Sequence, residues 1–127
     1  MTVSDVDVAR RAFDALGAGN VDDFASLLDP DVVIVGGRGP RHGIAAARAW
    51  AQPGDDEWTT TDLVTEDVRD LGDGRVLVLS RLVQRWAETG EVGDDAANAY
   101  LFTVRDGVIV HCLANLSRDR AEAEAAR

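Results

Sequence analysis

The chain has 127 residues, of which 46% are apolar, and 23 Asp and Glu residues against 13 Arg residues give a formal net charge of -10. This length and apolar content predict a single domain, residues 1–127, with one hydrophobic core. The acidic balance, with no lysine and no basic run, excludes the counterion-release affinity on which nucleic-acid and anionic-membrane binding depend. The first residues lack a signal-peptide pattern, and no stretch approaches the roughly 20 apolar residues of a membrane span, which predicts a cytoplasmic protein.

Several chemistries need side chains that this sequence scarcely has. Without lysine, neither Schiff-base catalysis nor a Walker-type phosphate loop is available. Cys112 is the only cysteine, which excludes an internal disulfide, and His42 and His111 have none of the spacings of a zinc site. His111 and Cys112 are neighbours on a predicted strand and point to opposite faces, so they cannot form a thiolate-imidazole pair. We therefore expect no metal and no cofactor.

Apolar residues at helical spacing and turn-forming residues divide the first part of the chain into short elements. Ser4 is an N-cap candidate ahead of an apolar stripe that ends at Leu16, and Gly17 and Gly19 then stop the helix. A later run of β-branched residues predicts a short strand, which a glycine-rich turn follows. The expected elements are helices over residues 4–16, 21–28 and 43–52, a strand over residues 32–35 and a turn over residues 36–40.

The second half of the chain contains long alternating runs separated by turn signals, and these runs predict strands. Asp106-Gly107 is typical of a tight hairpin between two of them. The Ala- and Glu-rich tail, residues 118–127, predicts a short helix or a frayed end. The expected strands cover about residues 59–71, 75–88, 97–104 and 108–116, with a polar loop over residues 89–95.

Helices first and then a long antiparallel meander is an α+β order. The segments that carry a family resemblance are Ala12-Phe-Asp-Ala-Leu-Gly-Ala-Gly-Asn-Val-Asp-Asp-Phe24, Leu27-Leu-Asp-Pro-Asp-Val32, His42-Gly43, Asp70-Leu-Gly-Asp73 and Val104-Arg-Asp-Gly-Val-Ile109. With them, almost the whole chain resembles the nuclear-transport-factor-2-like superfamily, which includes the SnoaL-like polyketide cyclases, ketosteroid isomerases and limonene epoxide hydrolases. The resemblance implies a cone-shaped, curved antiparallel sheet of the cystatin-like kind, with three N-terminal helices packed on its concave face.

The resemblance also implies a conical, mostly apolar pocket, and strand alternation then predicts which side chains face it. Arg81 and Arg85 would lack partners inside such a cone, so the alternate residues of that strand are expected to point inward. The expected inward set is Val76, Val78, Ser80, Leu82, Gln84 and Trp86 from the second long strand, Asn98, Tyr100 and Phe102 from the third, Val110, Cys112, Ala114 and Leu116 from the last, and Ala12, Leu16 and Trp50 from the helices.

Catalytic groups of the family's enzymes are missing at several positions that the resemblance aligns. Ala12 and Gly36 stand where the isomerases carry a tyrosine and an aspartate base, and Ala114 stands in place of the epoxide hydrolases' last-strand aspartate. Tyr100 remains near the third isomerase position and can donate a hydrogen bond to a developing oxyanion. The remaining acid or base candidates are His42 at the pocket rim, Asp119 after the last strand, and Asp62, Glu66 and Asp70 on a strand whose inward register stays open.

These observations predict a SnoaL-like protein that binds a small, largely apolar ligand such as a polyketide, terpenoid or steroid-like molecule. Any catalysis would be cofactor-free acid/base isomerisation, cyclisation or hydrolysis, with Tyr100, Asn98 and His42 as the catalytic candidates and Gln84 orienting the substrate. The alternative is a non-catalytic ligand-binding or dimerisation module that has lost the family's catalytic carboxylates.

The outward face of the second long strand suggests a partner for the sheet. Leu77, Leu79 and Val83 lie on this face, interleaved with Arg81 and Arg85. Such an apolar face needs cover, which a second subunit can supply. Since members of the resembled family often dimerise through this face, we expect a homodimer.

Overall fold

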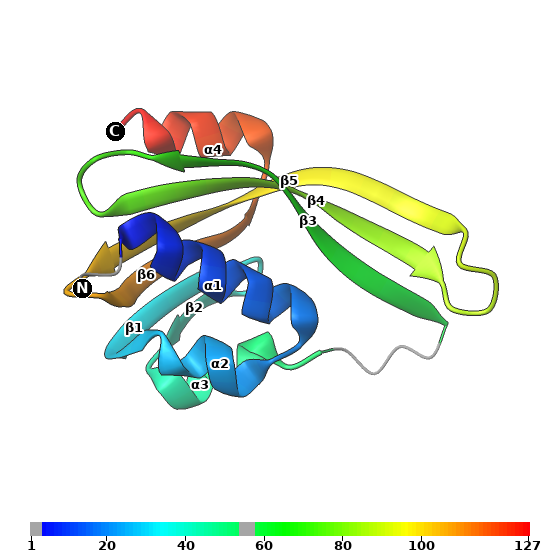
Figure 1. Cartoon of the computed structure of the whole chain (residues 1–127), viewed down its shortest axis with the longest axis horizontal. Coiled ribbons are helices and arrows are strands. Elements are labelled where there is room, and N and C mark those ends of the chain that lie inside the picture. The colour runs from blue at the N-terminus through cyan, green and yellow to red at the C-terminus, as the bar shows by residue number, and fades with distance from the viewer. Residues whose placement is uncertain (1–3, 54–57) are drawn as a thin grey trace.

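A computed structural model describes residues 4–53 and 58–127, which form four helices and a six-stranded sheet (Figure 1). Ser4 caps the first helix as predicted, because its hydroxyl oxygen accepts a hydrogen bond of 3.1 Å from the Asp7 amide. Gly19 ends that helix in the left-handed conformation, with φ of 71°. None of the described helices is long and apolar enough to cross a membrane. The helices are α1 (Asp5–Ala18), α2 (Val21–Ser26), α3 (Ile44–Ala51) and α4 (Arg118–Ala125).

The strands form one mixed sheet in the order β2-β1-β6-β5-β4-β3. Neighbouring strands are antiparallel, except that β1 and β6 pair in parallel. Helices gather on the faces of a mostly antiparallel sheet, so the predicted α+β class is confirmed. The strands are β1 (Leu28–Gly36), β2 (Gly39–His42), β3 (Thr59–Asp70), β4 (Arg75–Trp86), β5 (Val92–Arg105) and β6 (Val108–Leu116).

The main hydrophobic core lies between the sheet and the three N-terminal helices (Figure 1). Phe13 of α1 and Phe24 of α2 are at most 2% exposed and pack in one cluster with Val76, Val78 and Phe102 of the sheet. The structure therefore places these strand residues on the helix side, as the alternation predicted. Burying an aromatic side chain of this size stabilises the fold by roughly 3 kcal/mol relative to exposure.

Part of the opposite face of the sheet, for which a second subunit was the expected cover, is covered by α4 of the same chain. Leu77 and Leu79 of β4 are buried there in a second cluster with Ala121 of α4. Leu116 belongs to this second cluster as well, although the alternation predicted it on the inner face. A bulge in β6 moves it outward, because one extra residue reverses the alternation that follows.

Two segments differ in structure from the prediction. Part of the expected turn at residues 36–40 forms the start of β2, which pairs with β1 through Gly36 and Gly39. β5 begins at Val92, so much of the expected loop over residues 89–95 belongs to the sheet. Both segments are polar or rich in glycine, and pairing with a neighbouring strand decides their structure more than local propensity does.

β3, β4 and β5 continue past the helix layer, on the right of Figure 1. We call this part, residues 58–64 and 81–97, the free end of the sheet, and only its inner part, around Leu63, still meets the C-terminal end of α1. Its large apolar side chains include Trp58 and Trp86, which are 74% and 50% exposed. The free end therefore presents aromatic surface to solvent, in contrast to the rest of the sheet.

Candidate functional site

A cleft of about 540 Å³ opens on the helix side of the sheet, where the C-terminal ends of α1 and α3 approach β3. Leu16, Leu63 and Leu82 form apolar parts of its wall. Tyr100 of β5 and Asn115 of β6 also line the cleft. An apolar wall with a few convergent polar groups is typical of a small-molecule site.

Four polar side chains join in a hydrogen-bonded chain beside this cleft. The Tyr100 hydroxyl donates to Asn115 Oδ1 at 2.8 Å, and Asn98 Nδ2 donates to the same oxygen at 3.3 Å. The Ser80 hydroxyl donates to Asn98 Oδ1 at 2.6 Å. Ser80, Asn98 and Tyr100 are at most 9% exposed, so these bonds offset the cost of removing polar groups from water. This hydrogen-bonded chain thus connects the buried Ser80 hydroxyl to Asn115 at the cleft.

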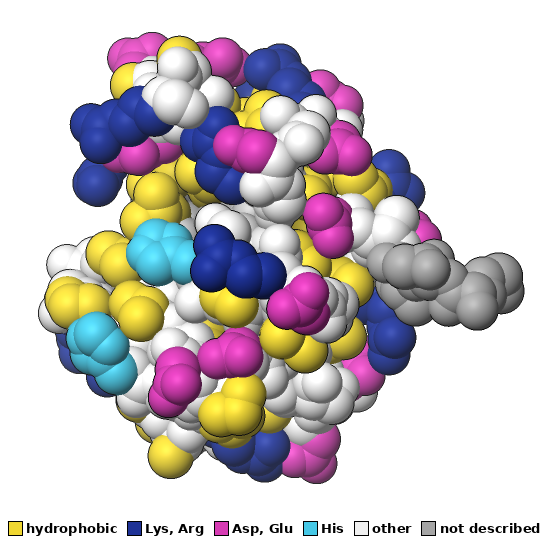
Figure 2. Space-filling view, turned by 90° about the vertical axis from the view of Figure 1, so that its left-hand side faces the viewer, with side chains coloured by type: hydrophobic (Ala, Val, Ile, Leu, Met, Phe, Trp, Pro, Cys, Tyr) yellow, Lys and Arg dark blue, Asp and Glu magenta, His cyan; other side chains and the backbone are white. Residues whose placement is uncertain are grey.

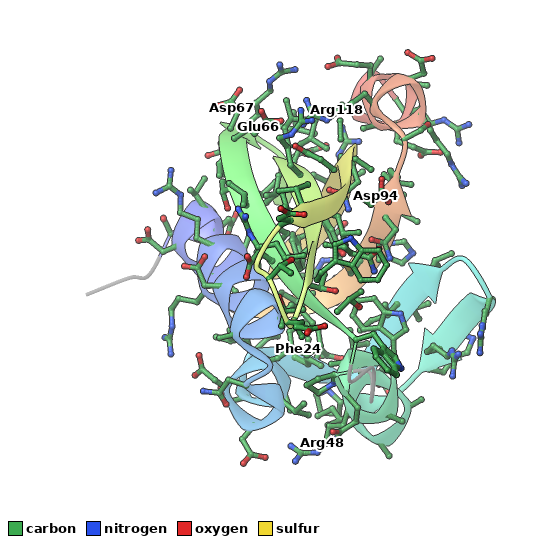
Figure 3. The ribbon with its side chains drawn as sticks, turned by 90° about the vertical axis from the view of Figure 1, so that its right-hand side faces the viewer. Phe24, Arg48, Glu66, Asp67, Asp94 and Arg118 are labelled. Atoms are coloured by element: carbon green, nitrogen blue, oxygen red, sulfur yellow. The ribbon has the colours of Figure 1, made fainter. Side chains whose placement is uncertain are left out.

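Arg118 of α4 supports the same two strands from the other face of the sheet. Its guanidinium donates to the backbone oxygens of Ser80 and Asn98, at 2.8 Å and 3.0 Å, and also binds Glu66. Figure 3 shows Glu66 and Arg118 together, far from Phe24 among the helices. Hydrogen bonds from a charged donor are stronger than neutral ones, so Arg118 fixes the backbone positions of Ser80 and Asn98.

Tyr100 is held in place by aromatic contacts as well as by its hydrogen bond. Its ring meets Phe13 edge-on with centroids 5.2 Å apart and stacks with Phe102 at 6.3 Å. Burial raises the pKa of Tyr100 well above its ordinary value, and Cys112 adds a smaller effect in the same direction. The phenol therefore keeps its proton. It acts as a hydrogen-bonding group and not as a base.

Asn115 reaches the cleft because of the bulge in β6. Leu101 pairs with Leu113 and Ala99 pairs with Leu116, so β6 has one residue more than β5 between these pairs. Asn115 has a positive φ of 56°, a conformation that asparagine tolerates better than most residues. Asn115 was not among the predicted site residues. An asparagine inside an apolar strand was the available signal, but it does not reveal which residue bulges.

No Asp, Glu, His, Lys or Arg lines this cleft in the part of the chain that the structure describes. The carboxylates that were candidate bases on β3 have other contacts. Asp62 lies 3.6 Å from Arg85 Nε, Glu66 binds Arg118, and Asp70 accepts a hydrogen bond from the Gly72 amide. Thr61 and Leu63 pair with Gln84 and Leu82 and therefore face the cleft side. After the register shift between Thr65 and Asp67, Val68 faces that side, opposite Val78.

The structure brings only part of the predicted site together. Leu16, Leu82, Gln84 and Tyr100 line the cleft, and Ser80 and Asn98 join it through hydrogen bonds. Five further members are buried in the packed core, which fills the inner part of the expected cone. These five are Ala12, Val78, Phe102, Cys112 and Ala114.

The other predicted site residues lie outside the cleft. His42 is exposed at the end of β2, and both histidines of the chain are visible on the face shown in Figure 2. Trp50 lines a separate recess, where its indole lies close to Gly36. Trp86 lies at the free end of the sheet, and Asp119 is in the first turn of α4. His42 therefore has no contact with the cleft through which it was expected to act.

Neither a metal cluster nor a reactive thiol accompanies the cleft within the described residues. No group of three or more His, Cys, Asp and Glu side chains there is arranged to hold a metal ion. Cys112 is fully buried, and this burial raises the pKa of its thiol well above the ordinary value. The polar side chains that line the cleft among the described residues are hydroxyls and amides.

The α+β arrangement, with helices on one face of a mostly antiparallel sheet, is the nuclear-transport-factor-2-like fold. The SnoaL-like domain matches residues 9–112, and the chain belongs to this family. A proposed polyketide cyclase from Pseudomonas putida shares the fold with a TM-score of 0.75 and 17% identity, over 98% of both chains. The Δ5-3-ketosteroid isomerase from a Mycobacterium species has a TM-score of 0.67 and 16% identity, over 92% of this chain and 96% of its own.

A further structural neighbour is an NTF2-like protein of unknown function from Cytophaga hutchinsonii. It has a TM-score of 0.67 and 16% identity, over 89% of both chains. Identities at this level show a shared fold and leave the activity open. No curated relative matches the chain in sequence.

Proposed function

We propose that the cleft binds a small, neutral and mostly apolar molecule, such as a polyketide, terpenoid or steroid-like compound, that carries a carbonyl or hydroxyl group. The main support is that the lining residues that the structure describes are uncharged and place a phenol and an amide beside apolar walls. An ionic ligand would find no opposite charge among the described lining residues. It would lose hydration without compensation.

The hydrogen-bonded chain indicates which ligand groups fit. Asn115 Oδ1 already accepts two hydrogen bonds, whereas no described residue accepts one from its Nδ2 group. A ligand carbonyl can therefore accept from Asn115 Nδ2. A ligand hydroxyl can donate to the free lone pair of the Tyr100 oxygen. Asn98 and Ser80 act through Asn115, so we assign them as positioning residues.

Catalysis is a second candidate function. Tyr100 keeps its proton and can stabilise an oxyanion, which supports cofactor-free isomerisation or cyclisation. Such reactions also need a base within reach of the substrate, and no Asp, Glu or His is among the described residues of the lining. We therefore favour the non-catalytic binding module over the enzyme.

Binding of 2-decalone, a neutral bicyclic ketone, measured by isothermal titration calorimetry, tests the proposed site. Asn115→Gly removes the amide yet tolerates the positive φ, and we expect it to weaken binding about 2- to 10-fold. Asp119→Asn, on α4, is the matched control and should bind like the parent protein. Unchanged binding in Asn115→Gly would show that the cleft is not the site.

A turnover assay with a Δ5-3-ketosteroid distinguishes the two candidate functions. We expect the absorbance of the conjugated product to rise no faster with the protein than in buffer. Conversion above that background, lost in Tyr100→Phe, would instead establish the enzyme. Asp119→Asn again serves as the control for folding and purity.

We also propose the homodimer expected from the sequence, through the outer face of the free end, since α4 covers the rest of that face. Val64 and Val92 are 45% and 51% exposed, beside the ion pair between Arg81 and Asp95. Light scattering should give a dimer mass for the parent protein and a monomer mass for Val64→Asp. A monomeric parent protein would contradict this proposal.

A further inference from the structure

A further recess, of about 480 Å³, lies beside the turn that connects β4 and β5, at the free end of the sheet. Trp58 and Trp86 line it together with Glu88 and Glu91. An indole that stays exposed forgoes the stabilisation that burial provides, so two of them in one recess need an explanation other than folding. Exposed aromatic groups rimmed by polar residues are typical of a binding surface.

Backbone hydrogen bonds hold this recess in shape without any ligand. The Ala87 amide donates to the Trp58 oxygen at 2.8 Å, and the Trp86 amide donates to the Glu91 oxygen at 2.9 Å. The Gly90 amide closes the turn on the Trp86 oxygen at 2.7 Å. These bonds fix the backbone of both tryptophans and of one glutamate, so the backbone of the recess needs little ordering on binding.

The Trp86 ring is further placed by Gly93. A Cβ atom at Gly93 would lie 3.1 Å from Trp86 Nε1, which shows that the indole packs against the bare backbone there. Pairing of Gln84 with Asp94 and of Arg85 with Val92 makes Gly93 the extra residue of a bulge. The missing side chain lets the indole lie along the strand.

The charge of the recess is complementary to a cation. Glu88 and Glu91 are the charged residues of the described lining, and the face of an indole ring attracts positive charge. Arg85 is nearby, but it lies 3.6 Å from Asp62, donates to the Gly90 oxygen and does not line the recess. A methylated ammonium carries its charge on an apolar surface and thus satisfies both the indoles and the carboxylates. We propose that this tryptophan recess binds small organic cations of the quaternary ammonium class.

Choline and its uncharged carbon analogue, 3,3-dimethylbutan-1-ol, test the proposal as a matched pair. Titration followed by broadening of the ligand methyl signals in proton NMR gives both affinities. We expect choline to bind at least about 3-fold more tightly and its affinity to fall as salt is added. Equal affinities would reduce the recess to an apolar surface and overturn the proposal.

Variants locate the choline site. Trp86→Leu should weaken choline binding about 3- to 10-fold, and the double variant Glu88→Gln/Glu91→Gln should weaken it and remove most of the salt dependence. The double variant carries the test if Trp86→Leu fails to fold by circular dichroism. Asn115→Gly, in the cleft, should bind choline like the parent protein. Loss in Asn115→Gly alone would place choline in the cleft and overturn the proposal.

Light scattering separates a ligand site from a subunit contact. The proposal predicts that Trp86→Leu keeps the oligomeric state of the parent protein. If the parent protein binds no choline and Trp86→Leu has a different oligomeric mass, the recess is a contact between subunits. That result would overturn the proposal while leaving the proposed function of the cleft untouched.

Discussion

β4 alternates along its whole length, yet its two ends have different surroundings. From Val76 to Ser80 each side chain is at most 6% exposed, because α1 lies on one face of the strand and α4 on the other. Arg85 and Trp86 lie beyond the helices and are exposed (Figure 1). Burial thus depends on what packs against a strand more than on its pattern. The covered end maintains the fold, and the free end is available for binding.

The largest expected difference between the two ends is in the free energy of unfolding. Phe102→Ala removes a fully buried ring from the covered end and should cost about 3–5 kcal/mol. Trp86→Ala at the free end should cost less than about 1 kcal/mol, because half of its surface is already exposed. Urea denaturation of both variants measures the contrast, and similar losses would contradict it.

Replacing an arginine should likewise cost more stability at the covered end than at the free end. Arg118→Ala leaves the Ser80 and Asn98 carbonyls without their charged donor and should cost about 1.5–3 kcal/mol. Arg81→Ala breaks an exposed ion pair with Asp95 and should change stability far less. The urea midpoints of the two variants provide the comparison, provided that their unfolding free energies depend on urea concentration with the same slope. An equal loss in Arg81→Ala would show that the free end also contributes to folding.

Alkaline pH should act on the covered end through Cys112. Burial raises the pKa of its thiol above the ordinary value of 9.0, so the unfolded chain loses this proton at a pH where the folded protein keeps it. Stability is therefore complete below pH 9 and falls as the pH rises, by up to about 1.4 kcal/mol per pH unit. Urea unfolding between pH 8 and 10.5 measures the slope, and Cys112→Ala should flatten it. An identical slope in Cys112→Ala would exclude the thiol as its source.

The sequence was sufficient for elements whose signals are local. Ser4 begins α1 as predicted, and the strand predicted over residues 108–116 matches β6, because caps and tight turns depend on neighbouring residues. The inward positions of Val76 and Val78 followed from alternation together with the rejection of buried arginines. These predictions needed no knowledge of distant contacts.

The candidate site was less predictable because tertiary contacts decide it. Alternation does not reveal the bulge that brings Asn115 into the cleft, nor the bulge that leaves Glu66 facing Arg118. The weakly amphipathic tail gave no sign that α4 would bury Leu77. His42 precedes a helix in both the prediction and the structure, but the pairing of β2 with β1 carries it away from the cleft.

Asn115 is one residue more than β6 needs to pair with β5, since three steps from Leu113 to Leu116 oppose two steps from Leu101 to Ala99. Without it, Ala114 would still face the helices and Leu116 would still face α4, in unbroken alternation. Loss of one codon would thus remove the amide from the cleft and leave both clusters of the core in register. In evolutionary terms, a lineage can gain or discard this polar group by a single in-frame insertion or deletion, without a change of fold.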